Sequence, residues 1–157
     1  MEKVNEKTIT VKDFINEYLI KQIGEIKDKY PYLAFILMAV GIEFLGKSIN
    51  GRKLNESGHS QEDFNTAISF MTKDYRTLKL YQNLRCGLAH SMTARNMTLS
   101  DNSGTQATLS VDDFYCDFKA LCEKIVNGDT LSISFPVDIT KPMFSVWNDP
   151  LGNSVTG

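Results

Sequence analysis

Histidine and cysteine are scarce in this sequence, with two histidines and three cysteines among 157 residues. Cys86, Cys116 and Cys122 are odd in number and form no C-x-x-C pair, which argues against a disulfide framework and a zinc knuckle. No H-E-x-x-H pattern or cluster of histidine and cysteine is present either. We therefore expect reduced, packed thiols, no metal site and no cofactor.

An apolar run of membrane-spanning length is also missing. The longest uninterrupted run, Tyr32 to Val40, has nine residues, whereas a transmembrane helix needs roughly 20. Residues 1–7 are polar and contain no apolar stretch typical of a secretory leader. We expect a cytoplasmic protein without a membrane partner.

Charge of one sign is not in excess over the whole chain. Seventeen Lys and Arg against nineteen Asp and Glu give a net charge of −2, which excludes a surface that is basic throughout. Any site for a polyanion must therefore be local.

Helical patterns dominate what is present. Thr10, Ser60 and Ser110 each precede a carboxylate three residues later, the arrangement of a helix N-terminus. Apolar spacing and stop signals then predict a helix in each of five ranges: 11–29, 31–45, 60–71, 73–94 and 110–127. The second of these is apolar around its whole circumference, so we expect it to be buried at the centre.

The remaining segments have weaker patterns. Residues 97–109 predict either a small hairpin or an irregular loop, and alternating apolar residues predict a strand over 130–137. Pro136, Pro142 and Pro150 interrupt the rest of the chain. The prediction is an all-α bundle of four to five helices over residues 1–129, with an extended or β segment, 130–157, packed on it.

Arg85 is anomalous within the fourth predicted helix. On a helical wheel it falls among Tyr81, Leu84 and Leu88, whereas His90 lies about 140° away on the polar side, at roughly 3.6 residues per turn. An arginine on an apolar face extends to solvent, pairs with a buried carboxylate or faces a subunit interface. Glu43, a lone carboxylate in the apolar second helix, is the candidate partner for a structural pair.

The segment from Arg85 to His90, Arg-Cys-Gly-Leu-Ala-His, resembles the signature of the HEPN superfamily. That signature is an Arg followed after four to six residues by a His, often within R-x-G-L-x-H. The motif covers under a tenth of the chain. The predicted order of helices is similar to the four-to-five-helix bundle of this superfamily.

The resemblance implies a homodimer in which the motif helices of two copies meet and place both Arg and both His in one cleft. In active members this cleft cuts RNA without a metal. By motif position, His90 would move the proton of the ribose 2′-hydroxyl or of the leaving oxygen, and Arg85 would hold the scissile phosphate. Imidazole and guanidinium suit these tasks, because the first exchanges a proton near neutral pH and the second is a permanent planar donor.

Basic residues gather around the motif. Residues 73–95 carry an excess of four positive charges, in contrast to the acidic remainder of the chain. This distribution is that of either a local phosphate-binding face or an ordinary solvated helix face. The candidate RNA-binding residues are Lys73, Arg76, Lys79, Asn83 and Arg95.

Two functional hypotheses follow. The first is a metal-independent endoribonuclease of the toxin-antitoxin or phage-defence type, acting with an antitoxin or another partner protein, and the retained Arg85 and His90 favour it. The second is a non-catalytic HEPN-like module that binds RNA, a nucleotide or a partner protein. Cys86 favours this second hypothesis, because it replaces the polar residue common after the motif Arg and is a weak hydrogen-bond donor. For His90 the structural alternative is a helix-end side chain bonded to a backbone carbonyl.

Overall fold

The computed structural model describes residues 5–75, 78–100, 109–128, 137–148 and 154–156. Within these ranges the fold is mostly helical, which confirms the predicted class at that level. The helical elements are α1 (Val11–Phe14), η1 (Ile15–Gln22), α2 (Ile23–Ile26), α3 (Pro31–Ile49), α4 (Ser60–Ser69), η3 (Tyr81–Cys86), α5 (Gly87–Ser91) and α6 (Val111–Val126). The strands are β1 (Asn5–Thr10), β2 (Leu99–Ser100), β3 (Leu109–Ser110), β4 (Pro142–Asn148) and β5 (Ser154–Thr156).

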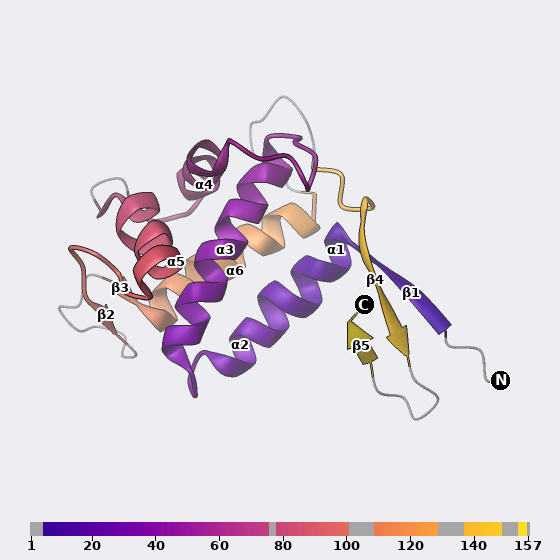
Figure 1. Ribbon diagram of the computed structural model, residues 1–157, viewed down its shortest axis with the longest axis horizontal. Helices are drawn as coiled ribbons and strands as arrows, with labels where there is room; N and C mark the ends of the chain where they lie inside the picture. The colour runs from indigo at the N-terminus through magenta and orange to yellow at the C-terminus, as the bar shows by residue number, and fades with distance from the viewer. Residues whose placement is uncertain (1–4, 76–77, 101–108, 129–136, 149–153, 157) are drawn as a thin grey trace.

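Helix α3 lies at the centre of the bundle (Figure 1). The continuous helix formed by α1, η1 and α2 packs on one side of it, α4 and α5 on the other, and α6 behind it. Phe35 of α3 stacks on Phe114 of α6, and both rings are fully buried. The η1 and η3 segments have the wider hydrogen-bond spacing of a π-helix.

One face of α3 remains exposed. Leu33, Leu37 and Val40 follow the i, i+4, i+7 spacing of a helix face and are 47%, 40% and 58% exposed. The prediction that this helix is buried all round is therefore wrong for this face. The described part of a single chain thus leaves about half of the surface of these three residues uncovered.

By length and composition α3 is the one helix of the described residues that could cross a membrane. Half of that span is buried inside the protein. Because the core helix of a soluble protein meets the same criterion, this is weak evidence for a membrane span, and the fold is compatible with a soluble protein.

Two of the three predicted helix starts have the expected caps. Thr10 and Asp13 form a capping box at α1, and Ser110 Oγ accepts a hydrogen bond from the Asp113 amide at α6. Ser60 does not cap α4. The residue at the cap is His59, and Ser60 Oγ donates instead to Glu43 Oε1 at 2.8 Å.

The predicted helix over 73–94 is too long. Residues 71–73 are bends, Asp74 and Tyr75 have no regular secondary structure, and α-helical structure begins again at Leu80 and ends at Ser91. Lys79 and Met92 bracket it with φ angles of 48° and 54°, in the left-handed region that a right-handed helix does not tolerate. We call η3 and α5 together, residues 81–91, the motif helix.

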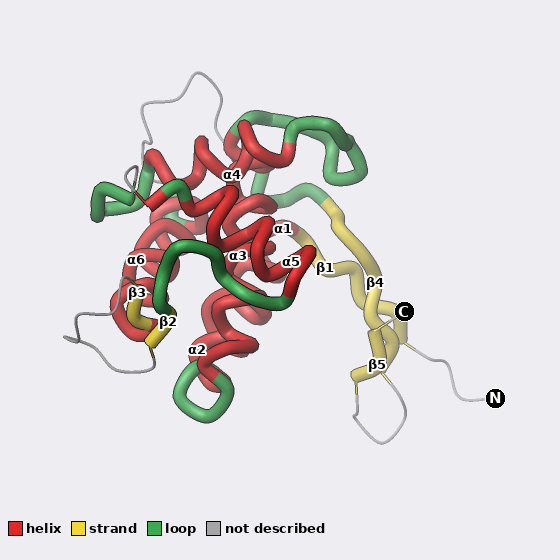
Figure 2. The backbone as a smooth tube through the Cα atoms, turned by 60° about the vertical axis from the view of Figure 1, so that its left-hand side comes forward, coloured by secondary structure: helices red, strands yellow, loops and turns green. Residues whose placement is uncertain are grey.

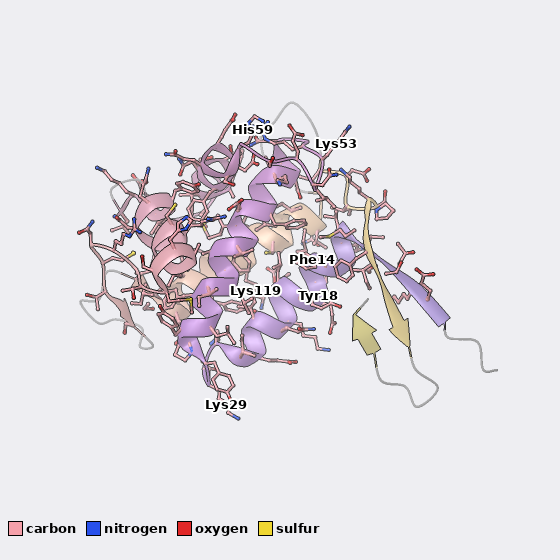
Figure 3. All side chains as sticks on the ribbon, in the orientation of Figure 1. Phe14, Tyr18, Lys29, Lys53, His59 and Lys119 are labelled. Atoms are coloured by element: carbon pink, nitrogen blue, oxygen red, sulfur yellow. The ribbon has the colours of Figure 1, made fainter. Side chains whose placement is uncertain are left out.

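Three strands form a small antiparallel sheet in the order β1-β4-β5. The strand β1 was not predicted, and Pro142, expected to interrupt the tail, begins β4. The sheet also contacts the first helix. The ring of Phe144 in β4 packs edge-on against the rings of Phe14 and Tyr18, which lie on α1 and η1 (Figure 3). Strand β4 thus packs on the first helix. The strand predicted over 130–137 lies, apart from Val137, outside the described residues.

The strands β2 and β3 pair in parallel, so they are not the two antiparallel strands of the predicted hairpin, and residues 101–108 between them lie outside the described residues. The loop after α5 runs across the bundle to reach β2, which lies beside β3 (Figure 2).

Candidate functional site

Arg85 lies near the end of η3 and is paired with Glu43 of α3. The Arg85 Nε atom donates to Glu43 Oε2 at 2.7 Å, and the two side chains are 23% and 17% exposed. An arginine on the apolar side of its helix thus meets the lone carboxylate of the central helix. The contact uses Nε, so it does not commit the two terminal amino groups of the guanidinium.

Glu43 is held from a second direction. Its other oxygen, Oε1, accepts the hydrogen bond from Ser60 Oγ at the start of α4. Three helical elements, α3, α4 and η3, therefore meet at this carboxylate. Because both oxygens have partners, the orientation of Arg85 is fixed by the bundle as well as by its own helix.

His90 lies in the last turn of α5, and its side chain is exposed. It forms no hydrogen bond with another described residue, so the alternative of a bond to a backbone carbonyl is not seen in this part of the chain. His90 and Arg85 belong to one continuous helix, and the structure shows no contact between them within one chain.

The predicted RNA-binding residues differ in what they do. Lys79 is exposed, and Lys73 lies 3.8 Å from Asp113 with over half of its side chain exposed. Arg95 is exposed and donates to Ser91 Oγ at 3.3 Å. Arg76 lies outside the described residues.

Asn83 serves a structural role instead. Its side-chain nitrogen donates to the Leu78 carbonyl at 2.9 Å, and its side-chain oxygen accepts a bond from Asn96 at 3.3 Å. Its backbone carbonyl accepts the Arg95 amide at 2.7 Å. Asn83 therefore ties together the two chain segments that flank the motif helix.

The structure shows why the motif has a glycine at position 87. The Thr93 amide donates to the Gly87 carbonyl, and a Cβ atom at Gly87 would lie 2.4 Å from the Thr93 carbonyl oxygen. The chain after α5 therefore folds back directly over this position, which only glycine allows without a shift.

We expect Gly87→Ala to destabilise the protein by about 1–3 kcal/mol, because the backbone at Thr93 must move away to accept the new methyl group. Urea unfolding followed by circular dichroism measures the change. Ala89→Ser, at an exposed position of the same helix, is the matched control. Equal midpoints for the Gly87 variant and the wild type would contradict the close approach.

Tyr81 and Cys86 line the same region of η3. The Tyr81 ring packs edge-on against Phe64 of α4, with 5.7 Å between ring centroids. Burial, and then the neighbouring Cys86 thiol, raise the pKa of Tyr81. The phenol therefore stays neutral at physiological pH and is not an anionic base.

A metal centre has no ligand set in the part of the chain that the structure describes, where no group of three or more His, Cys, Asp or Glu side chains converges. His59, the other histidine, lies at the far end of α3 beside Glu56 and Glu62 (Figure 3).

Sequence analysis missed two features. One is the exposed apolar face of α3 described above. The other is a cavity between α4 and the start of the motif helix. The apolar spacing in α3 could have indicated the exposed face, because the neighbouring helices cannot cover a long helix that is apolar all round. The cavity has no local sequence signal.

Comparisons with protein-family models, with curated proteins and with solved structures found no match.

Proposed function

We propose that this protein is a HEPN-like endoribonuclease that acts as a homodimer and cuts RNA without a metal. The observation that carries the proposal is the held guanidinium of Arg85, oriented by Glu43 and located on the same short helix as the exposed His90. A guanidinium can bind a phosphate, and an imidazole can act as a general acid or base.

In the proposed reaction the ribose 2′-oxygen forms a bond to phosphorus while the bond from phosphorus to the 5′-oxygen breaks. His90 of one copy, neutral, takes the proton of the 2′-hydroxyl. The protonated His90 of the second copy gives a proton to the 5′-oxygen as it leaves. The terminal amino groups of Arg85 bind the phosphate oxygens and stabilise the added charge of the transition state. The products are a 2′,3′-cyclic phosphate and a 5′-hydroxyl.

The exposed apolar face of α3 supports the proposal that two copies of the chain form a dimer. The Arg85–Glu43 pair joins the motif helix to α3 at Glu43, three residues beyond Val40. Exposed contiguous apolar surface of this kind is typical of a protein–protein interface. A two-fold pairing through α3 and the motif helix covers Leu33, Leu37 and Val40 and gives both copies of Arg85 and His90 one shared cleft.

The test is cleavage of a mixed RNA pool in EDTA by the wild type and by His90→Ala. We expect the wild type to cut and the variant to be slower by a factor of about 10²–10⁴, the usual contribution of a general acid or base. His59→Ala, which removes the other histidine, is the matched control and should cut like the wild type. Equal rates for the wild type and His90→Ala, or no cutting by the wild type, would contradict the proposal.

The second candidate function is a non-catalytic module that binds RNA, a nucleotide or a partner protein such as an antitoxin. The Arg85–Glu43 pair favours it, because the carboxylate already neutralises the guanidinium, and Cys86 favours it as before. RNA binding by the wild type that is salt-dependent, without cleavage in EDTA or in magnesium, would support this function. Either function is compatible with the cytoplasm, where we place the protein.

A further inference from the structure

A cavity of about 640 Å³ lies between α4 and the chain that leads into the motif helix. Its size is within the range of about 300–1,000 Å³ that holds small ligands. Gln61 and Asn65 line it from successive turns of α4, and Lys79 and Gln82 line it from the chain that enters the motif helix. Ile68 forms part of its apolar lining.

The polar groups of this cavity are available to a ligand. The side chains of Gln61, Asn65 and Gln82 are exposed and form no hydrogen bond with other described residues. An amide presents a donor and an acceptor side by side, which is the arrangement that pairs with the edge of a nucleobase. Three such groups around one cavity are suited to a base.

Positive charge lies at the same cavity. Lys73 and Lys79 are both exposed and line it, and Lys73 Nζ also lies 3.8 Å from Asp113 Oδ2. Asp74 also lines it, but Asp74 already interacts within the chain. Tyr75 lines it too, with its hydroxyl donating to Asp117. The ammonium groups of the two lysines can therefore bind an anionic part of the ligand.

Two lining residues of the cavity lie close in sequence to the Arg85–Glu43 pair and its Ser60 contact. Ser60, which binds Glu43, is the neighbour of Gln61, and Gln82 precedes Arg85 by less than one helical turn. The cavity and Arg85 thus share the α4 start and the motif helix, and an RNA strand is the ligand class that can use both.

We propose that the cavity binds one nucleotide of single-stranded RNA, with the amides of Gln61, Asn65 and Gln82 holding the base and Lys73 and Lys79 holding the phosphate. The inference rests on the proposed function in taking RNA as the ligand. Because single-stranded RNA is recognised through the exposed edges of its bases, the cavity gives the protein a base preference.

The test measures the dissociation constants of four labelled hexanucleotides, A6, C6, G6 and U6, by fluorescence anisotropy. The His90→Ala background keeps the RNA intact. We expect at least a fivefold preference for one base, which Gln61→Ala and Asn65→Ala together abolish. Asn16→Ala, which removes an exposed amide on η1, should keep the preference. Thermal unfolding of each variant confirms that it is folded.

The lysine variants should affect RNA binding differently from the amide variants. Lys73→Ala and Lys79→Ala should weaken the binding of all four RNAs and lower the dependence of log K on log salt by about 0.7 for each contact removed. Lys124→Ala, an exposed lysine of α6, should change neither quantity.

Amide variants that retain both affinity and preference overturn the inference, as does equal binding of all four hexamers. Tighter binding of a free nucleoside 5′-monophosphate than of the matching hexamer assigns the cavity to a free nucleotide and also overturns it. The proposed nuclease activity is tested separately, by the cleavage assay. If the wild type does not cut RNA but the amide variants lose the base preference, the result supports the nucleotide site in the cavity and contradicts the nuclease.

Discussion

Leu37→Glu is expected to convert the protein to a monomer and to remove RNA cleavage. Leu37 lies in the middle of the exposed apolar face of α3 and is 40% exposed, so a carboxylate there is solvated in a single chain. In a two-fold dimer the same change places two like charges in a desolvated interface. Light scattering after size-exclusion chromatography should show the mass falling from twice 17.7 kDa to 17.7 kDa.

Cleavage should fall with the dimer, because one copy supplies only one His90 and one Arg85. Gln22→Glu introduces the same charge on the exposed surface of η1 and should keep both the dimer and the activity. A Leu37→Glu protein with wild-type mass would show that α3 is not the interface. A monomeric Leu37→Glu protein that cuts at the wild-type rate would show that the cleft is complete within one chain.

Gly46→Ala is expected to prevent folding. A Cβ atom at Gly46 would lie 1.6 Å from the backbone oxygen of Asp63 and 2.3 Å from its carbonyl carbon. These are backbone atoms of α4, so no side-chain rotation relieves the overlap, and the two helices must separate. Overpacking typically costs about 1–3 kcal/mol and here should exceed that range, against a total stability of about 5–15 kcal/mol.

The measurement is the soluble yield and the urea unfolding midpoint of the variant. Gly41→Ala is the matched control in the same helix. There the nearest atoms, at 3.0 and 3.2 Å, belong to the side chains of Phe118 and Leu19, which can adjust, and alanine favours the helix by about 1 kcal/mol. A Gly46→Ala protein as stable as the wild type would show that α3 and α4 do not pack backbone to backbone.

The sequence predicted the ends of helices where bonds between neighbouring residues fix them. Ser110 caps α6, and Asn127 with Gly128, at a φ of 71°, ends it, as the sequence indicates. Pro31 begins α3 at the position where its missing amide costs nothing. The pairing of Arg85 with Glu43 is foreseeable as well, because each is the one charge of its kind on an apolar face.

The errors arise where a distant segment competes with the local preference. The hydroxyl of Ser60 could bond to its own helix or to Glu43, and the fold brings Glu43 within 2.8 Å. The amide of Asn83 could face RNA, but the returning chain at Asn96 and the carbonyl of Leu78 engage it. Lys79 adopts a left-handed conformation that its residue type does not signal, and the helix therefore begins after it.

The sequence alone determined the helical class of this protein, the caps of its first and last helices, and the motif that places an arginine and a histidine on one helix. These features depend on side-chain spacing and on bonds between neighbours. Tertiary structure alone decided the pairing of β1 with β4, the cavity beside α4 and which side of the apolar α3 stays exposed. Each of these depends on which surfaces remain after the helices have packed, and that outcome is set by contacts between residues far apart in the chain.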